Sequence, residues 1–202
     1  SIAQSAAIPA GAVVRDLGSG TGSTSVMLAQ EYGLITYAAD LWSDPSDNMR
    51  FFEERGLDNK QIIPLKANVQ ERLPFANEFF DAVVSIDSYN YFGRAAAFLD
   101  NKLLPYVKHG GVILIALPGM KKDCHDNLPS CLLASWNADQ LEYMHDIAWW
   151  SCIFQQSAEA ELLLIEQMEC TCQAWKDWLA CDNDYARGDR ASIEAGALDY
   201  LN

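Results

Sequence analysis

The sequence predicts an α/β protein with a mostly parallel sheet that is covered by helices on both faces. Apolar stretches of strand length alternate with helical stretches along residues 12–117. The first apolar stretch runs into a glycine-rich turn, residues 16–22, and a helical stretch follows directly. Half of the 202 residues are hydrophobic, which is enough for a full core. We therefore expect a single domain over residues 1–202.

The individual elements are predicted from apolar runs bounded by turn residues, and from helical stretches bounded by capping residues. The expected strands cover residues 12–17, 34–41, 61–67, 80–86, 112–117 and 161–168. The expected helices cover residues 23–32, 46–55, 94–104, 147–157, 173–179 and 191–201. Asp146 is expected to cap the helix that begins at residue 147. Residues 120–145 show little periodicity, and so long a connection in a compact domain is usually functional, so we expect it on the substrate side.

The glycine-rich turn reads Asp-Leu-Gly-Ser-Gly-Thr-Gly from Asp16 to Gly22. Glycines allow a ligand to approach the backbone where a Cβ would collide with it. In a dinucleotide site this turn would hold a pyrophosphate, which Asp16 would repel. The third glycine of the dinucleotide fingerprint would also fall at Ser23. The acidic residue therefore favours a ligand that carries an ammonium group.

At this motif the sequence resembles the Rossmann-like, or class I, S-adenosylmethionine-dependent methyltransferases, whose first motif is an acidic residue followed by G-x-G-x-G. The resemblance runs from about Val13 to Met168. Toward the C-terminus, at residues 145–150 and 168–170, it is similar to an uncharacterised bacterial subgroup of the small-molecule type. It implies a three-layer fold that normally includes an N-terminal cover helix and a seventh, antiparallel strand. The sequence shows neither, so we expect that the chain either lacks these parts or is a fragment of a longer protein. The resemblance also implies that S-adenosyl-L-methionine is the cofactor.

The resemblance assigns cofactor-binding residues beyond Asp16. Asp40 lies 24 residues after Asp16, at the end of the second expected strand, where an acid accepts both ribose hydroxyls. Asn68 stands where the family often has an aspartate, and its amide oxygen can still accept the adenine amino hydrogen. The further expected contacts are Gly18, Ser19, Gly20 and Thr21 in the turn, Leu41 and Trp42 on the adenine, Val69 on the ring, and Asp87 with Ser88 on the methionine part.

On the substrate side we expect Tyr89, Tyr91 and Trp149. The alternative for both tyrosines is packing on the helix that follows. His145 is the candidate general base, because it ends the long connection just before a helix and titrates near neutral pH. The alternative for His145 is a residue at the start of a helix with no chemical role.

Composition narrows the class of partner. The net charge of −14 argues against a nucleic-acid substrate, because phosphate contacts need a basic face. No apolar run is long enough to span a bilayer and no secretory signal is present, so we expect a cytoplasmic protein. The six cysteines lack paired C-x-x-C spacing, and we expect reduced, buried structural thiols and no metal. The alternative is a metal site that involves Cys124 with His125, Cys131, or Cys170 with Cys172.

These observations predict a methyltransferase that acts on a small molecule by in-line methyl transfer. The alternative is a protein that binds S-adenosylmethionine or S-adenosylhomocysteine without turnover, as a sensor or a degenerate subunit. A nicotinamide-dependent oxidoreductase is disfavoured by Asp16 and Ser23. Arg15 would place a charge in a central strand, where it needs a partner that the sequence does not identify. The oligomeric state is not predicted.

Overall fold

The computed structural model describes residues 8–202, which divide into two compact units. The first, here called the sheet unit, contains residues 8–117 and 157–160. The second, here called the helical unit, contains residues 118–156 and 161–202.

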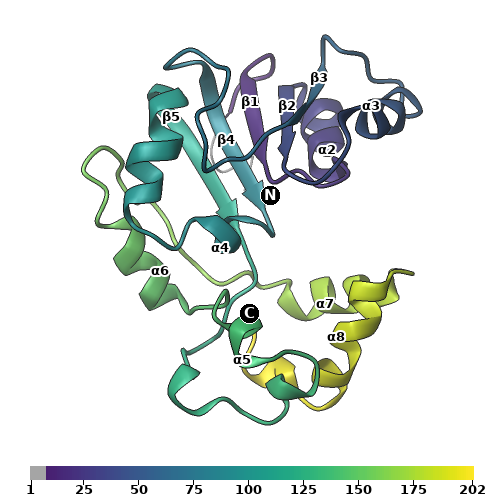
Figure 1. Cartoon of the computed structure of the whole chain (residues 1–202), viewed down its shortest axis with the longest axis vertical. Helices are drawn as coiled ribbons and strands as arrows, with labels where there is room; N and C mark the ends of the chain where they lie inside the picture. Colours follow the sequence, from purple (N-terminus) through teal and green to yellow (C-terminus); the bar gives the residue numbers. More distant parts are fainter. Residues whose placement is uncertain (1–7) are drawn as a thin grey trace. The chain divides into compact units, whose positions relative to one another are not determined.

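The sheet unit is built on five parallel strands in the order β3-β2-β1-β4-β5 (Figure 1). This sheet confirms the predicted α/β class. The strands are β1 (Val13–Leu17), β2 (Ile35–Asp40), β3 (Ile62–Lys66), β4 (Phe80–Ile86) and β5 (Val107–Ala116). Strand β5 begins earlier than expected, because its pairing with β4 already starts at Val107 and then shifts register between Phe80 and Ala82.

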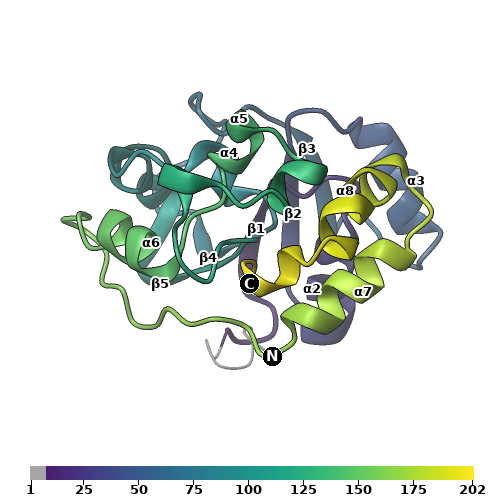
Figure 2. The ribbon, with the colours of Figure 1, turned by 90° about the horizontal axis from the view of Figure 1, so that it is seen from below.

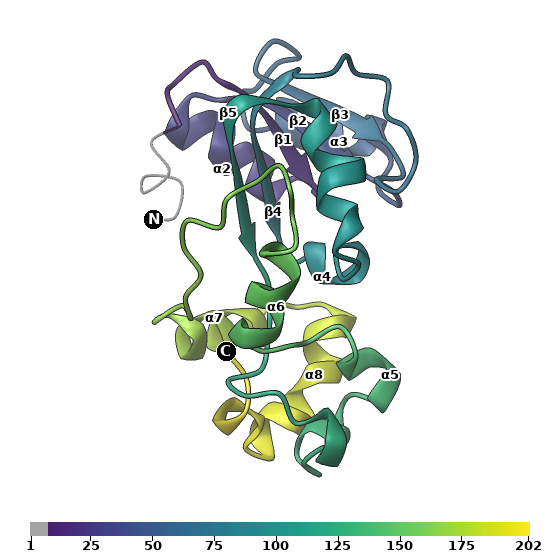
Figure 3. The same cartoon turned by 90° about the vertical axis from the view of Figure 1, so that its left-hand side faces the viewer.

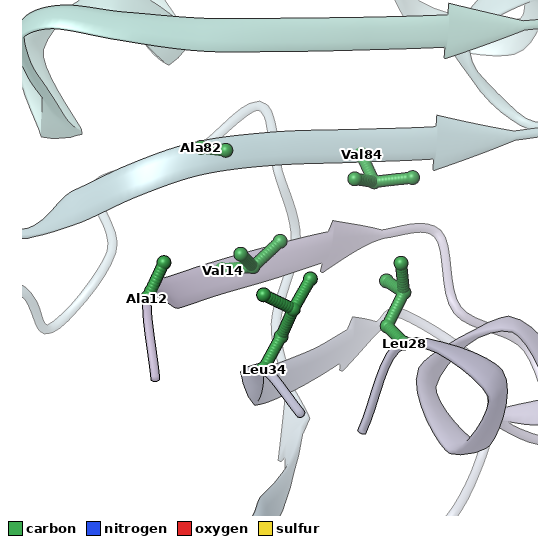
Figure 4. Packing of buried hydrophobic residues seen from close by; sticks show 6 residues of the cluster. All are labelled: Ala12, Val14, Leu28, Leu34, Ala82 and Val84. Carbon is green, nitrogen blue, oxygen red and sulfur yellow. The ribbon is translucent and has the colours of Figure 1, made fainter. Parts of the chain in front are cut away.

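Helices α2 (Ser23–Tyr32) and α3 (Pro45–Glu53) cover one face of this sheet. Leu28 of α2 is 1% exposed and packs against Val14 of β1 and Val84 of β4 (Figure 4). Phe52 of α3 is fully buried in a second cluster that includes residues of α2, β2 and β3. The two helices therefore pack on the sheet through two clusters, one against β1 and β4 and one against β2 and β3.

The opposite face is covered by residues 68–79 and by a helical segment that ends at Tyr106. Tyr106 packs in a cluster with Tyr37 of β2 and Phe80 of β4. Figure 3 shows this helical segment and α2 on opposite sides of the sheet. The expected helix over 94–104 begins only at residue 97 and is mostly not α-helical: it continues into a π-helical turn η1 (Leu99–Leu103) and a 3₁₀ turn η2 (Leu104–Tyr106). A separate short helix, α4 (Tyr89–Phe92), precedes it. Pro105 has no amide hydrogen, so a regular α-helical ladder cannot continue through it.

Arg15 lies on this second face, because successive side chains of β1 alternate and Asp16 points toward α2. Its side chain is 1% exposed, and its Nε and Nη2 atoms have no hydrogen-bond partner among the described residues. Burial lowers the pKa of Arg15 to about 10, although the nearby Tyr106 acts in the opposite direction. The sheet unit thus holds a buried guanidinium that the described residues satisfy only in part.

The helical unit contains α5 (Ala138–Leu141), α6 (Ile147–Phe154), α7 (Thr171–Ala180) and α8 (Asp184–Glu194), with short 3₁₀ turns at His125–Asn127, Leu132–Ala134 and Ala197–Asp199. Helices α7 and α8 lie side by side (Figure 2). The core of the helical unit is formed by Met120, Leu132, Trp136, Leu141, Ala197 and Leu201. The predicted cap of α6 is confirmed, because the Asp146 carboxylate accepts the Trp149 amide at 2.9 Å.

Two predicted elements of this unit are wrong. Residues 161–168 form no strand, and Leu163 and Leu164 are 80% and 65% exposed. An apolar run needs a neighbouring strand to form a ladder, and none pairs with this one in the described chain. The last helix is α8 rather than residues 191–201, because Asn183 caps its first turn and Gly196, at φ +95°, lies just beyond its end. None of the helices that the structure describes is long and apolar enough to cross a membrane.

The packing of α2 predicts that truncating two neighbouring residues, Leu28 and Met27, changes the free energy of unfolding by very different amounts. Leu28→Ala should lower the free energy of unfolding by about 2–5 kcal/mol, because it leaves a cavity against β1 and β4. Met27→Ala is the matched control, since Met27 is 38% exposed and its truncation should change stability by at most about 0.5 kcal/mol. Urea denaturation of both variants measures the difference, and equal losses would contradict the packing described for α2.

Candidate cofactor and active site

The glycine loop, residues 18–22, joins β1 to α2 and closely approaches the end of β4. Gly18 has φ +75°, and a Cβ added there would lie 2.5 Å from the Cβ and Oγ atoms of Ser88. Gly20 has φ +54°, but an added Cβ would meet nothing within 4 Å. The loop is therefore tightly packed at Gly18 and faces open space at Gly20, where a ligand can approach the backbone.

Asp40, the last residue of β2, binds this loop through its carboxylate. Its Oδ2 accepts the Gly20 amide at 3.0 Å, and its Oδ1 accepts the amides of Trp42 and Ser43 at 2.8 Å each. Burial acts to raise the pKa of Asp40, but these backbone hydrogen bonds outweigh it and hold the pKa below its usual value. A carboxylate accepts about four hydrogen bonds, and the Ser43 hydroxyl also lowers the pKa of Asp40 by hydrogen bonding, so a ligand hydroxyl has to displace or share one of these donors.

Asn48 of α3 holds the same loop residue from the other side. It is 5% exposed, and its Nδ2 donates to the Gly20 carbonyl at 3.0 Å. The amide and the carbonyl of Gly20 are thus both fixed by side chains from other elements. Sequence reasoning missed Asn48, because nothing distinguishes it from other polar residues of a helix.

Asp16 is buried beside this loop as a carboxylate with a single hydroxyl donor. It is 1% exposed, and its Oδ2 accepts the Ser25 hydroxyl at 2.6 Å. Burial raises the pKa of Asp16 to about 6, the Ser25 hydrogen bond opposes this, and the nearby Asp40 charge adds to it. Within residues 8–202 no cationic side chain lies at ion-pair distance from Asp16 or Asp40. The parallel register of β1 and β2 therefore concentrates negative charge at one end of the sheet. Ser25 was also missed, although a serine in the first turn after the loop was a possible signal.

The ends of β1 and β4 are joined by two buried serines. The hydroxyl of Ser88 lies 2.7 Å and that of Ser85 3.0 Å from the Leu17 carbonyl, and the two hydroxyls lie 2.7 Å apart. Between them in the chain, Asp87 is exposed and has φ +53°, and its amide donates to the Ala116 carbonyl at 2.8 Å. A left-handed aspartate at a strand end is a sparsely populated conformation, which is common at functional sites.

The remaining cofactor candidates lie around this end of the sheet. Leu41 and Trp42 are 44% and 82% exposed directly after Asp40. Thr21 is exposed, whereas the Ser19 hydroxyl is buried without a hydrogen-bond partner among the described residues. Asn68 and Val69 follow Ala67, whose amide donates to the Asp40 carbonyl at 2.8 Å. The Asn68 amide oxygen already accepts the Gln70 amide at 3.0 Å, which leaves one of its two lone pairs.

The two candidate substrate tyrosines differ in burial. Tyr89 is 1% exposed and packs edge-on against Phe92 and Phe98, with ring centroids 5.6 and 5.8 Å away. Burial raises the pKa of its phenol well above the usual range, and the charge of Asp100 adds to this. Tyr91 is 54% exposed. Of the two, only Tyr91 presents a large surface to a ligand without rearrangement.

His145 lies in the helical unit, where Asp123 and Trp149 orient its ring. Its Nδ1 lies 3.0 Å from Oδ2 of Asp123, and its ring stacks on Trp149 with centroids 3.7 Å apart and planes at 9°. The other oxygen of Asp123 lies 2.6 Å from Nδ1 of His125. Burial acts to raise the pKa of Asp123, but hydrogen bonds from His145 and His125 lower it to about 2. Sequence reasoning named His125 only together with Cys124, as the less favoured metal alternative, and missed Asp123, for which the Asp-x-His spacing in the long connection was the available signal.

Comparison with known proteins bears on both the fold and the family. A search among curated protein sequences finds no significant match. Among solved structures, this chain is similar to geranyl diphosphate C-methyltransferase from Streptomyces coelicolor. The match covers 98% of this chain and 70% of that enzyme, with a TM-score of 0.73 and 16% identity. A second match is a SAM-dependent methyltransferase from Geobacter sulfurreducens in complex with S-adenosyl-L-homocysteine. It covers 99% of this chain and 86% of that protein, with a TM-score of 0.64 and 16% identity.

Phosphoethanolamine N-methyltransferase 2 from Haemonchus contortus, in complex with S-adenosyl-L-methionine, matches 100% of this chain with a TM-score of 0.70 and 19% identity. The chain spans 49% of the length of that enzyme. At such identities the three structures establish a shared fold, the Rossmann-like fold of S-adenosylmethionine-dependent methyltransferases.

The family itself is established by sequence. The model of the family described as methyltransferase domain matches residues 15–115, which is half of the chain and includes all of the glycine loop, Asp16 and Asp40. The chain therefore belongs to the methyltransferase-domain family.

Proposed function

We propose that this chain binds S-adenosyl-L-methionine at the glycine loop and catalyses in-line transfer of its methyl group to a small molecule. The observation that carries this proposal is the pair Asp16 and Asp40 beside the open backbone of Gly20. Two carboxylates without a cationic partner among the described residues favour a positively charged ligand and repel a pyrophosphate.

The residues present fit this cofactor. The Asp40 carboxylate can accept a ribose hydroxyl in place of the Ser43 hydroxyl, while its three backbone hydrogen bonds stay in place. Leu41 and Trp42 offer exposed apolar surface for an adenine beside it. The buried Ser19 hydroxyl without a described partner, and Asp87 in its left-handed conformation, line the end of the sheet where the methionine part would bind.

S-adenosylmethionine, when bound, supplies a methyl group that is already activated by its positively charged sulfur. The chain has two tasks. It holds the methyl donor and the methyl acceptor in line, and it removes a proton from the acceptor where the acceptor carries one. The fixed loop performs the first task, because both backbone groups of Gly20 are held by side chains. Asp16 favours the positive charge of the donor through its own negative charge.

His145 is the proposed proton acceptor. Because the Asp123 carboxylate accepts from Nδ1, the neutral imidazole keeps its proton on Nδ1 and its lone pair on Nε2. Stacking on Trp149 fixes the plane of the ring. Tyr91 and Trp149 remain our proposed substrate contacts, and Tyr89 would need to leave its aromatic contacts to join them.

Three observations support a small-molecule acceptor. The net charge of −14 disfavours nucleic acid. The structural relatives from Streptomyces and Haemonchus are named for geranyl diphosphate and phosphoethanolamine, which are both small molecules. Exposed aromatic rings such as Tyr91 suit a cationic or apolar acceptor. A screen of such acceptors with methyl-labelled S-adenosylmethionine tests the proposal, and tight cofactor binding without any turnover would favour the sensor alternative.

The Asp40 carboxylate has two separable roles. Asp40→Ala should weaken S-adenosylmethionine binding by roughly 1.5–3 kcal/mol, because a charged acceptor is lost. It should also destabilise the free protein, because the amides of Gly20, Trp42 and Ser43 lose their acceptor. Asp47→Ala is the control, since that side chain is 71% exposed in α3. Calorimetry and urea denaturation measure the two effects, and unchanged affinity in Asp40→Ala would remove Asp40 from the ribose site.

The buried charge of Asp16 predicts a trade-off between stability and binding. Because the pKa of Asp16 is raised from 3.8 to about 6, its contribution to stability is complete below pH 3.8 and is lost as pH rises through about 6. Asp16→Asn should therefore raise the free energy of unfolding near neutral pH by up to about 3 kcal/mol. The same variant should bind S-adenosylmethionine more weakly.

Urea denaturation on both sides of this pH range, with calorimetric titration of the cofactor, checks both halves of the prediction for Asp16. The stability gain should shrink as the pH falls toward 4, because the wild-type carboxyl is then protonated as well. A variant that binds the cofactor as tightly as the wild type would contradict the proposed role of the charge.

For His145, the catalytic role and a purely structural role predict different results. His145→Ala should lower turnover by about 10²–10⁴-fold with little change in cofactor affinity if His145 removes a proton. If it only packs on Trp149, stability falls and turnover per folded molecule does not. His109→Ala, which changes an exposed histidine of β5, is the matched control. Turnover and thermal unfolding measured on the same preparations decide between the two roles.

A further inference from the structure

We propose that Asp123, His125 and His145 form a binding site for a divalent transition-metal ion such as Zn²⁺ or Co²⁺. One ligand atom from each of these residues lies within 4.8 Å of the other two. All three residues belong to the helical unit, so the site does not depend on the methyltransferase proposal.

The hydrogen bonds of His125 show why a cation belongs there. Its Nε2 lies 3.0 Å from the Leu141 carbonyl, which can only accept, so Nε2 carries a hydrogen. In a neutral imidazole Nδ1 then carries a lone pair. Nδ1 of His125 lies 2.6 Å from Oδ1 of Asp123. A lone pair on Nδ1 would repel this carboxylate oxygen unless a positive charge lies between or beside the two atoms. A metal ion or an additional proton satisfies this arrangement.

The surroundings favour the metal ion. Metal-binding histidines usually donate their other ring nitrogen to a backbone carbonyl or a carboxylate, as His125 does to Leu141. The Asp123 carboxylate is shared between both histidines, and its backbone amide is held by Asp146 at 3.0 Å. The second imidazole, His145, is held in place by Trp149. Two imidazoles and one carboxylate suit zinc and neighbouring first-row metals, and three protein ligands leave one position for water.

Binding redistributes protons in a defined way. The ion forms bonds to Nδ1 of His125, Nδ1 of His145 and an oxygen of Asp123. A proton on Nδ1 of an imidazolium at His125 is released to solvent, and the proton on Nδ1 of neutral His145 moves to Nε2. A loaded His145 therefore cannot accept a proton at Nε2, and the metal would inhibit any transfer that uses His145 as a base.

The test uses the full chain after treatment with a chelator and gel filtration. Calorimetric titration with Zn²⁺ should give one ion per chain, with the release of protons into the buffer. The Co²⁺ complex should show visible bands without a thiolate-to-metal charge-transfer band, and X-ray absorption should count two imidazoles per ion. Asp123→Asn and His125→Ala should each weaken binding by at least about 10-fold.

Two control variants test whether side chains outside this cluster bind the zinc ion. His109→Ala changes a histidine outside the cluster, and a Cys170→Ser/Cys172→Ser double variant removes two exposed thiols that could bind zinc. Both should bind Zn²⁺ as the wild type does. The proposal is overturned if binding survives in His125→Ala, if it is lost in the cysteine variant, or if the Co²⁺ spectrum shows thiolate ligands.

A measurement on the wild type removes the dependence on variants that fail to fold. Nitrogen-15 NMR of the histidine side chains reports which ring nitrogens carry protons. We expect the Nδ1 signals of His125 and His145 to shift on addition of Zn²⁺. A His125 that stays protonated at both nitrogens throughout the titration would show that the cation is only a proton, and would refute the metal site whether or not the methyltransferase proposal holds.

Discussion

The hydrogen bond from the Gly20 amide to the Asp40 carboxylate connects the fold of this protein with its proposed chemistry. It ties the glycine loop to the end of β2, and Asn48 of α3 completes the attachment through the Gly20 carbonyl. The parallel register of β1 and β2 makes this geometry possible, because it brings the loop after β1 beside the last residue of β2. The loop is therefore held in place by the fold itself before any ligand binds.

The same register concentrates unpaired negative charge. Asp16 is buried with only the Ser25 hydroxyl as a side-chain partner, and the charge of Asp40 raises its pKa further. Such an arrangement opposes folding near neutral pH and favours a positively charged ligand, so stability and function act in opposite directions at this residue. The buried Arg15 lies on the other face of the sheet, so its charge does not reach Asp16 as an ion pair among the described residues.

Much of the sheet could be predicted from the sequence, because apolar runs and glycines report local structure directly. The bounds of β4 and α2 were predicted correctly. The strand at residues 161–168 failed because a strand depends on a pairing partner that its own sequence does not specify. The same limit applies to the site. Asp16 and Asp40 carry a recognisable spacing, whereas Ser25, Asn48, Asp123 and His125 gain their roles only from contacts that the fold creates.

We propose that the end of the sheet at Asp16 and Asp40 selects a cationic adenosyl ligand rather than a dinucleotide. Calorimetric titration of the wild-type chain with S-adenosylmethionine, S-adenosylhomocysteine and NADH tests this claim most directly. We expect both adenosyl ligands to bind at one site per chain, since both carry the ribose and the ammonium group, and we expect no binding of NADH. Binding of NADH, or the absence of binding by S-adenosylmethionine, would contradict the account.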